Sequence, residues 1–339
     1  MTTHHSDVLI VGAGPAGLSL ATSLAQAGFT ATVVEQQSDS TLAAPAPDGR
    51  EIALTHPSRD TLQRLGSWGL LAAHEVGTIC EAQVHDGPLG QHSALQLNTP
   101  QTPEGAAPGA LGFIVPNHAL RRTAYAVAAR TPGVQLITQA QVTRAATLAG
   151  HAELDYVPAG TTGAPPQRLT APLLVAADSR FSETRRLLGI GAQLKDFGKT
   201  MLVCRMDHEK PHRQTAWEWF GYGQTLALLP LNGEQSSVVL TLPPREIERL
   251  RAHRNAAMLK SLLDQNGLPY MKGESHIVPL LIGGGLLWGT SRADAGLRGV
   301  QAAVVNNDEM VTVNGQMMPL GRQLAAELVD SDRQQNFTW

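Results

Sequence analysis

Cysteine is scarce in this chain, which has only Cys80 and Cys204 among its 339 residues. The two are far apart and in neither a metal-binding nor a redox spacing, which excludes a disulfide-stapled scaffold and favours a reducing compartment. No run of residues approaches ~18 uninterrupted apolar positions, so no transmembrane helix is expected. Residues 1–7 contain no Lys or Arg, which is not typical of a signal peptide. Together these absences predict a cytoplasmic protein.

An excess of either charge is also lacking, because 26 Lys and Arg stand against 29 Asp and Glu, for a net charge of −3. This balance excludes a general electrostatic attraction to nucleic acid. What is present is a large apolar fraction, 42% of the residues, with 16% charged. Such a composition supports a sizeable core and excludes wholesale disorder. At about 150 residues per domain, the length predicts roughly two domains.

The first motif is a glycine-rich turn between a predicted strand, Asp7–Val11, and a predicted helix, Pro15–Ala27. Residues 12–17 read Gly-Ala-Gly-Pro-Ala-Gly, the G-x-G-x-x-G fingerprint of dinucleotide-binding βαβ units. Its three glycines in order permit the tight turn, let a pyrophosphate approach the backbone, and let helix and strand pack closely. The helix N-terminus adds free N–H groups and the positive end of its dipole. A glycine-rich turn without a ligand is the alternative.

An acidic residue follows at the expected distance. Glu35 ends the next predicted strand, Ala31–Val34, about 20 residues after Gly14. A carboxylate there accepts hydrogen bonds from a ribose diol and repels a 2′-phosphate, so NADP is not expected at this site. The fingerprint alone does not distinguish FAD from NAD.

Three further charged residues lie near expected ligand positions. Arg50 follows a loop, where a cation either meets a pyrophosphate or is simply solvated. Arg121 begins a predicted helix over Leu120–Ala129, and an exposed helix face is the alternative. Asp178 follows a buried strand, Pro172–Ala176, and ligands of open α/β sheets bind at the carboxyl ends of strands. The alternative is that Asp178 caps the next helix.

The middle of the sequence has a different pattern. Short apolar runs separated by tight turns predict antiparallel strands over Thr200–Met206, Ala216–Phe220, Gln224–Leu229 and Ser236–Leu242. Trp217, Trp219 and Tyr222 lie here, although aromatic residues make up only 4% of the chain. These three are candidates for contact with an aromatic substrate. Packing of the two tryptophans in the sheet core is the alternative that we favour.

Residues 208–212 spell His-Glu-Lys-Pro-His, which matches the H-E-x-x-H zinc signature. That site requires both histidines on one face of a helix, and Pro211 costs about 3 kcal/mol inside a helix. We therefore expect a turn with solvated histidines and no metal site.

Three stretches, residues 7–36, 48–66 and 173–190, together resemble one family. They are similar to the FAD-dependent aromatic hydroxylases of the p-hydroxybenzoate hydroxylase fold. Within these the chain resembles the ubiquinone-biosynthesis hydroxylases, most closely the UbiM branch. In the third stretch Asp178 matches the Asp-Gly motif of the family, with Ser179 in place of the usual glycine.

The resemblance implies an α/β fold in which a Rossmann-type FAD-binding domain carries an inserted antiparallel-sheet substrate domain. It assigns residues 1–79, 112–190 and 270–339 to the FAD-binding domain, and residues 80–111 and 191–269 to the substrate domain. It also implies an FAD-dependent monooxygenase that uses O₂ and NAD(P)H to hydroxylate the aromatic ring of a ubiquinone precursor. The flavin carries this chemistry, so no side chain is assigned as the catalyst.

By the same resemblance, the cofactor-binding residues are Gly12, Ala13, Gly14, Pro15, Ala16, Gly17, Glu35, Gln36, Arg50, Arg121 and Asp178. The apolar tail of such a substrate implies peripheral contact with a membrane or with other ubiquinone-biosynthesis proteins. One family feature is missing: the Gly-Asp-Ala-Ala segment of the C-terminal third, because no Gly-Asp dipeptide occurs in this sequence. The alternative function is therefore a non-catalytic or flavin-deficient homologue that serves as a binding or scaffold subunit.

Overall fold

The computed structural model describes residues 4–86, 95–98, 109–161, 163–194, 196–208, 211–221, 223–247, 310–313 and 316–319. Within these ranges, no helix is long and apolar enough to cross a membrane.

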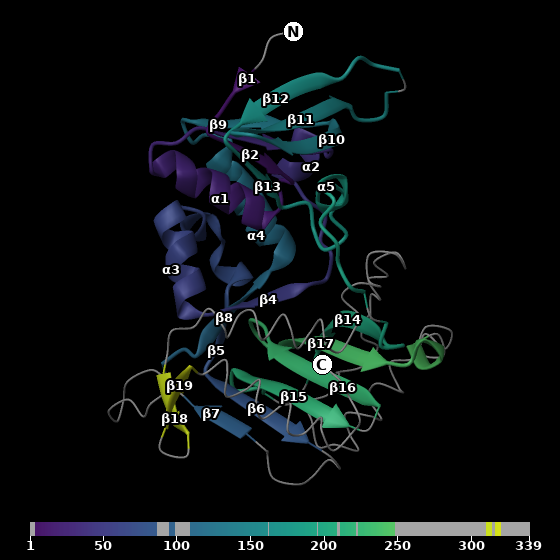
Figure 1. Cartoon of the computed structure of the whole chain (residues 1–339). Coiled ribbons are helices and arrows are strands. Elements are labelled where there is room, and N and C mark those ends of the chain that lie inside the picture. The colour runs from purple at the N-terminus through teal and green to yellow at the C-terminus, as the bar shows by residue number, and fades with distance from the viewer. Residues whose placement is uncertain are drawn as a thin grey trace.

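A parallel sheet organises the first half of the fold, with the strand order β13–β2–β3–β9 (Figure 1). Its strands are β2 (Val8–Val11), β3 (Ala31–Val34), β9 (Val134–Ile137) and β13 (Leu173–Ala176). β2 and β3 are buried along their whole length, which explains why both read as unbroken apolar or β-branched runs.

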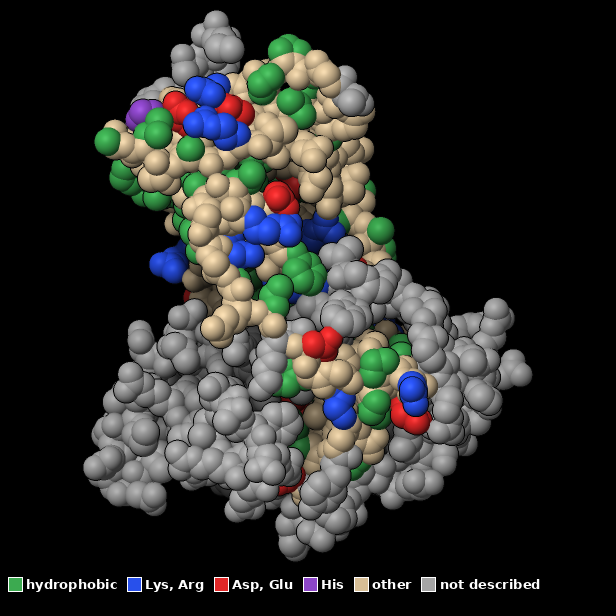
Figure 2. Space-filling model, turned by 45° about the vertical axis from the view of Figure 1, so that its right-hand side comes forward, with side chains coloured by type: hydrophobic (Ala, Val, Ile, Leu, Met, Phe, Trp, Pro, Cys, Tyr) green, Lys and Arg blue, Asp and Glu red, His purple; other side chains and the backbone are tan. Residues whose placement is uncertain are grey.

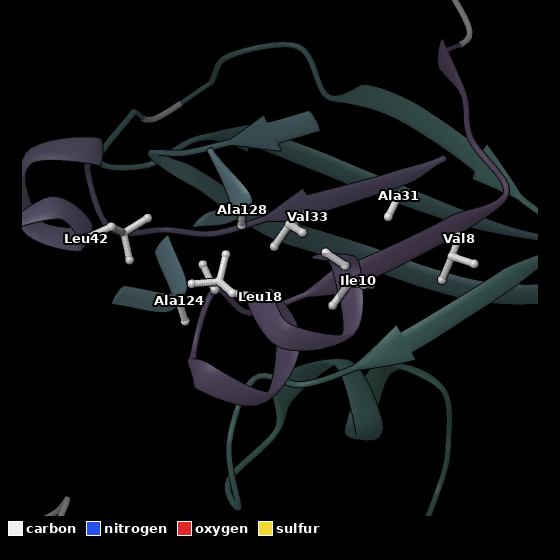
Figure 3. Packing of buried hydrophobic residues seen from close by; sticks show 10 residues of the cluster. Val8, Ile10, Leu18, Ala31, Val33, Leu42, Ala124 and Ala128 are labelled. Carbon is white, nitrogen blue, oxygen red and sulfur yellow. The ribbon is translucent and has the colours of Figure 1, made fainter. Parts of the chain in front are cut away.

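Helices α1 (Pro15–Gln26) and α4 (Asn117–Ala128) pack on one face of this sheet. Leu18 of α1 and Ala124 and Ala128 of α4 meet Ile10 and Val33 of the sheet (Figure 3). Small side chains on α4 let the helix lie close to its neighbours, because they place little bulk between the backbones. The short helix α2 (Asp39–Ala43) adds Leu42 to the same core.

The other face of the parallel sheet is covered by a second sheet, in the order β1–β12–β11–β10. Its strands are β1 (His4–His5), β10 (Ala140–Leu148), β11 (His151–Pro158) and β12 (Gln167–Ala171). Leu154 and Leu169 pack against Leu9 and Val11 of β2. The parallel sheet therefore lies between helices and a second sheet, while its edge strand β13 stays partly exposed.

A three-stranded antiparallel sheet, in the order β4–β8–β5, leads from this half to the next. Its strands are β4 (Glu51–Leu54), β5 (Gly77–Ile79) and β8 (Gly112–Pro116). The segment between β4 and β5 forms helix α3 (His56–Leu65) and the 3₁₀ helices η1 (Trp68–Leu70) and η2 (Ala73–Glu75).

The second half is a six-stranded sheet, in the order β14–β17–β16–β15–β6–β7 (Figure 1). Its strands are β6 (Glu81–Asp86), β7 (Leu95–Asn98), β14 (Thr200–Asp207), β15 (Thr215–Gly221), β16 (Gln224–Pro230) and β17 (Gln235–Leu242). All neighbours are antiparallel except β15 and β6, which pair in parallel. The remaining elements are α5 (Glu183–Leu187), β18 (Met310–Val313) and β19 (Gln316–Pro319).

The fold class predicted from the sequence is confirmed: a Rossmann-type sheet with helices is combined with an antiparallel sheet. The four predicted antiparallel strands are β14 to β17, each within two residues of its predicted limits. The division into two domains at the residues given above stays a prediction. Part of it, residues 270–309 and 320–339, lies outside the described residues, as does the region where the Gly-Asp segment is expected.

Candidate functional site

The glycine-rich turn leaves no room for side chains at its first and last glycines. Gly12 has φ +105°, and a Cβ added to it would lie 2.5 Å from the carbonyl oxygen of Ala177. A Cβ added to Gly17 would overlap the carbonyl oxygen of Gly12. Both glycines are therefore required by the close packing of α1 against the ends of β2 and β13.

Gly14 differs from its neighbours, because a Cβ added to it would meet nothing within 4 Å. The residue is the N-cap of α1, yet no side chain bonds the exposed N–H groups of the first turn, and Pro15 occupies the start of the helix. Free backbone donors beside open space are the features by which a helix N-terminus binds a pyrophosphate. This part of the chain fits such a group.

Glu35 lies at the end of β3, beside the turn. Its carboxylate accepts hydrogen bonds from the backbone N–H of Ala13 (2.8 Å) and of Gln37 (2.8 Å). The Gln37 side chain in turn accepts a bond from the Arg121 guanidinium of α4 (2.9 Å). The structure thus brings Glu35 and Arg121 to the same edge of the sheet, whereas Gln36 is exposed.

Asp178 lies directly across the turn from Gly12, because a Cβ on Gly12 would lie 2.9 Å from the Asp178 nitrogen. Its carboxylate accepts bonds from the Ser182 hydroxyl and from the Thr184 N–H (3.0 Å). The Ser182 hydroxyl also accepts a bond from the Arg185 N–H (2.9 Å). Asp178 therefore holds the start of α5 and stands beside the fingerprint at the same time.

A second polar group surrounds Arg50. The Arg50 guanidinium pairs with Asp48 (2.5 Å), and the Asn117 amide donates to the same carboxylate (2.6 Å). Burial acts to raise the pKa of Asp48, but the bonds from Arg50 and Asn117 outweigh it and keep this pKa below its usual value. Burial lowers the pKa of Arg180, and the positive charge of nearby Arg50 adds to the effect. Arg180 therefore lies near enough to the Arg50–Asp48 pair for the charge of Arg50 to affect it.

The junction between the two halves carries a buried ion pair. Arg205 of β14 donates to the Glu51 carboxylate of β4 with two nitrogens, at 2.6 and 2.9 Å. The Glu51 side chain is 1% exposed, and its second oxygen has no hydrogen-bond partner. Burial raises the pKa of Glu51, although Arg205 opposes this. On the face of the molecule shown in Figure 2, Lys and Arg side chains gather near the middle.

Comparison with known protein families identifies the family of this chain. The FAD binding domain family matches residues 5–269. The chain belongs to this family. The glycine-rich turn, Glu35 and Asp178 all lie within the residues that match this family.

Two curated proteins show the same relationship. The chain is 41% identical over 264 residues to ubiquinone hydroxylase UbiM of Neisseria meningitidis, which covers 76% of this chain and 55% of that protein. It is 34% identical over 238 residues to ubiquinone hydroxylase UbiL of Rhodospirillum rubrum, covering 70% and 52%. The chain therefore spans about half the length of the curated relatives it matches.

Solved structures support the same fold. PqsL of Pseudomonas aeruginosa in complex with 2-aminobenzoylacetate aligns with a TM-score of 0.62 at 19% identity, covering 85% of this chain and 72% of PqsL. The flavin-dependent monooxygenase PieE, in complex with FAD and substrate, aligns with a TM-score of 0.57 at 17% identity, covering 78% and 47%. At these identities the likeness shows the fold alone.

The two candidate substrate tryptophans lie in the six-stranded sheet. Trp219 is 9% exposed and belongs to the hydrophobic core of this sheet. Trp217 packs against the same core, and its ring stacks on that of His85 with 5.3 Å between the ring centroids. This is the packing alternative, and contact with a substrate stays a prediction. Tyr222 lies outside the described residues.

The expectation of solvated histidines in residues 208–212 is wrong for His208. This side chain is fully buried and lies 3.0 Å from the Ser236 hydroxyl. Both ring nitrogens of His212 contact backbone groups. Nδ1 accepts a hydrogen bond from the N–H of Gln214, and Nε2 lies at hydrogen-bond distance from the carbonyls of Leu231 and Gly233. Glu209 and Lys210 lie outside the described residues, and elsewhere in the described ranges no group of three metal-binding side chains is found.

Sequence reasoning missed Gln37, Asn117 and Glu51. Asn117 follows Pro116 at the start of a helical pattern. Polar side chains at the start of a helix commonly form hydrogen bonds with nearby groups. Glu51 offers no such signal, because its partner Arg205 is 154 residues away. Only the packing of β4 against β14 brings the two together.

Proposed function

We propose that this chain is the FAD- and substrate-binding part of a monooxygenase that hydroxylates the aromatic ring of a ubiquinone precursor, with O₂ and NAD(P)H. The observation that carries the proposal is the 41% identity to a ubiquinone hydroxylase over 264 residues. The glycine-rich turn also lies within residues 5–269, which match the FAD binding domain family. When bound, FAD supplies the electron transfer and the activation of oxygen. The chain supplies binding, orientation and exclusion of water.

In this proposal the turn of residues 12–17 holds the pyrophosphate through the free N–H groups of α1. Glu35 accepts bonds from the ribose hydroxyls in addition to its backbone partners, because a carboxylate can accept several bonds at once. Gln37 holds this carboxylate through its backbone N–H, and Arg121 of α4 holds the Gln37 side chain. Asp178, beside the turn, and Arg50 contact the rest of the cofactor.

The first test is the visible absorption spectrum of the desalted protein after incubation with FAD. A flavin band that survives desalting is the expected result. Oxygen uptake is then followed with NADH or NADPH, with and without 2-octylphenol as probe, and stimulation by the phenol is expected.

A protein that stays colourless would contradict the proposal and favour the flavin-deficient homologue acting as a binding subunit. Proposed contact with a membrane is tested separately, by flotation with vesicles that contain the alkylphenol. Association only when the phenol is present would point to substrate capture at the membrane surface.

A further inference from the structure

One face of the six-stranded sheet has no assigned role so far. Side chains alternate along a strand, so Glu218 points away from the buried core that holds its neighbour Trp219. Arg205 also lies opposite to the core, because its neighbour Cys204 belongs to it. Since Arg205 bonds Glu51 of the nucleotide-binding half, this is the face directed toward that half.

This face is mostly apolar in its centre and partly open. Ala216, Phe220, Ala227, Leu229 and Val239 keep intermediate exposure, whereas Val203, Ser237 and Thr241 of the same face are buried. An apolar wall that stays accessible beside a cofactor domain suits an aromatic ring with a hydrocarbon chain.

Glu218 is the exception within this wall. Its cross-strand neighbours on either side are Ala227 and Val84, and the next residues in the same row are Val239 and Val203. Among the described residues no hydrogen-bond or ion-pair partner of Glu218 is found. Arg205 is three strands away, about 14 Å at the usual strand spacing, too far for an ion pair.

The side chain is enclosed but not sealed. Glu218 keeps intermediate exposure, and yet burial raises the pKa of its carboxyl. Protein atoms therefore surround most of this carboxyl group, while part of the side chain stays accessible to solvent. A raised pKa makes the ionised carboxylate a stronger base, and an acid perturbed in this way without a described partner is typical of a functional site.

We propose that the Glu218 carboxylate binds the hydroxyl group of the aromatic substrate and takes up its proton. This inference rests on the proposed function. The O–H bond of the phenol breaks, its electron pair stays on the phenol oxygen, and the proton passes to a carboxylate oxygen. No electron leaves the ring, which becomes richer in electrons and so more reactive toward oxygen transfer. The surrounding apolar face holds the hydrocarbon chain.

The test compares the full chain with two variants, Glu218→Gln and the matched control Asp86→Asn. Asp86 lies on the same face of β6 but is exposed at its end. Binding of 2-octylphenol and of its methyl ether, which has no acidic proton, is measured by equilibrium dialysis with FAD present. The wild type and Asp86→Asn are expected to prefer the phenol at least 10-fold, and Glu218→Gln to lose this preference. An ultraviolet difference spectrum should show phenolate in the first two proteins alone.

If Glu218→Gln keeps the preference and the phenolate band, the assignment of Glu218 is overturned while the proposed function stands. If the wild type binds neither compound, the proposed substrate class fails instead. A third variant, Glu218→Leu, tests whether Glu218 instead stabilises the fold. Removal of an unpaired acid should raise the urea concentration at the midpoint of unfolding at neutral pH, and a lower midpoint would overturn the proposal.

Discussion

Gly14 and Gly17 are three residues apart, but an added methyl group has opposite consequences at the two positions. At Gly17 the methyl collides with the backbone of Gly12, which is fixed by its hydrogen bond to Val34 of β3 and by its close approach to Ala177. At Gly14 the methyl points into open space. Gly17 is therefore required by the packing of the fold, whereas Gly14 leaves space for a bound group to approach the backbone.

We therefore expect Gly17→Ala to destabilise the chain by about 2–4 kcal/mol, in the range of forced core overlaps. Gly14→Ala should cost no more than about 1 kcal/mol, mainly through a poorer N-cap, yet weaken FAD binding at least 10-fold. Urea unfolding and quenching of flavin fluorescence give the two quantities. Equal effects of the two substitutions on both quantities would contradict this division.

Among the elements, α5 depends most on two side chains. This helix has only five residues, too few to be stable alone, so its start is fixed by the carboxylate of Asp178 and the hydroxyl of Ser182. The two groups also bond each other. Loss of one therefore disturbs the bonds of the other.

Asp178→Ala and Ser182→Ala should each lower the free energy of unfolding by about 1 kcal/mol, the usual value of an N-cap. The double variant should lose less than the sum, because the two side chains share one network. A double-mutant cycle in urea measures this. If Asp178 also contacts FAD, Asp178→Ala alone weakens FAD binding, and equal binding by both single variants would limit Asp178 to capping.

Sequence patterns anticipated those elements whose residues repeat a simple rule. β2, α1 and β3 follow from apolar runs around a glycine fingerprint, and the strands of the six-stranded sheet follow from regular turns. β10, β11 and β12 escaped notice because they bury only one face and carry charges, including Asp155, which is buried by pairing with Arg168 at 2.7 Å. β4 is as long as β2 and β3 but begins with a charged residue, Glu51, and β5 has only three residues, so neither forms a recognisable apolar run.

The candidate site divides in the same way. Local motifs placed Glu35 and Asp178 at the turn, because each follows directly from a strand end. Glu51 and Glu218 were not anticipated, since the environment of each is set by strands distant in sequence. A lone acid in a strand carries no local signal of burial.

At the scale of the molecule, the Glu51–Arg205 pair joins the two halves. Burial raises the pKa of Glu51, and loss of Arg205 would raise it further. A folded-state pKa above the unfolded value of about 4.3 means that stability falls as pH rises between the two values. Removal of one partner of a buried pair costs about 3–5 kcal/mol. The cost is smaller here, because Arg205 is 48% exposed and screened by water.

Arg205→Ala should therefore lose about 1–3 kcal/mol, and this deficit should grow as the pH rises above the unfolded-state pKa of about 4.3 toward the raised pKa of Glu51. The double variant Glu51→Gln with Arg205→Ala should show no such growth, because the buried charge is gone. Arg186→Ala, which breaks an exposed pair with Glu183, is the control with a small, constant effect. Urea midpoints across pH measure all three, and a constant deficit for Arg205→Ala would show that Glu51 stays solvated.

The parallel pairing of β6 with β15 has a consequence for the order in which the chain assembles. Glu81 of β6 pairs with Thr215 of β15. During synthesis, more than a hundred further residues must therefore be made before β15 can cover the inner edge of β6. Until then β6 and β7 form a two-stranded ribbon with an open edge, which attracts other unpaired strands. Contacts between distant segments also slow folding. The nascent chain therefore passes through a stage in which it depends on dilution or on chaperones to avoid aggregation.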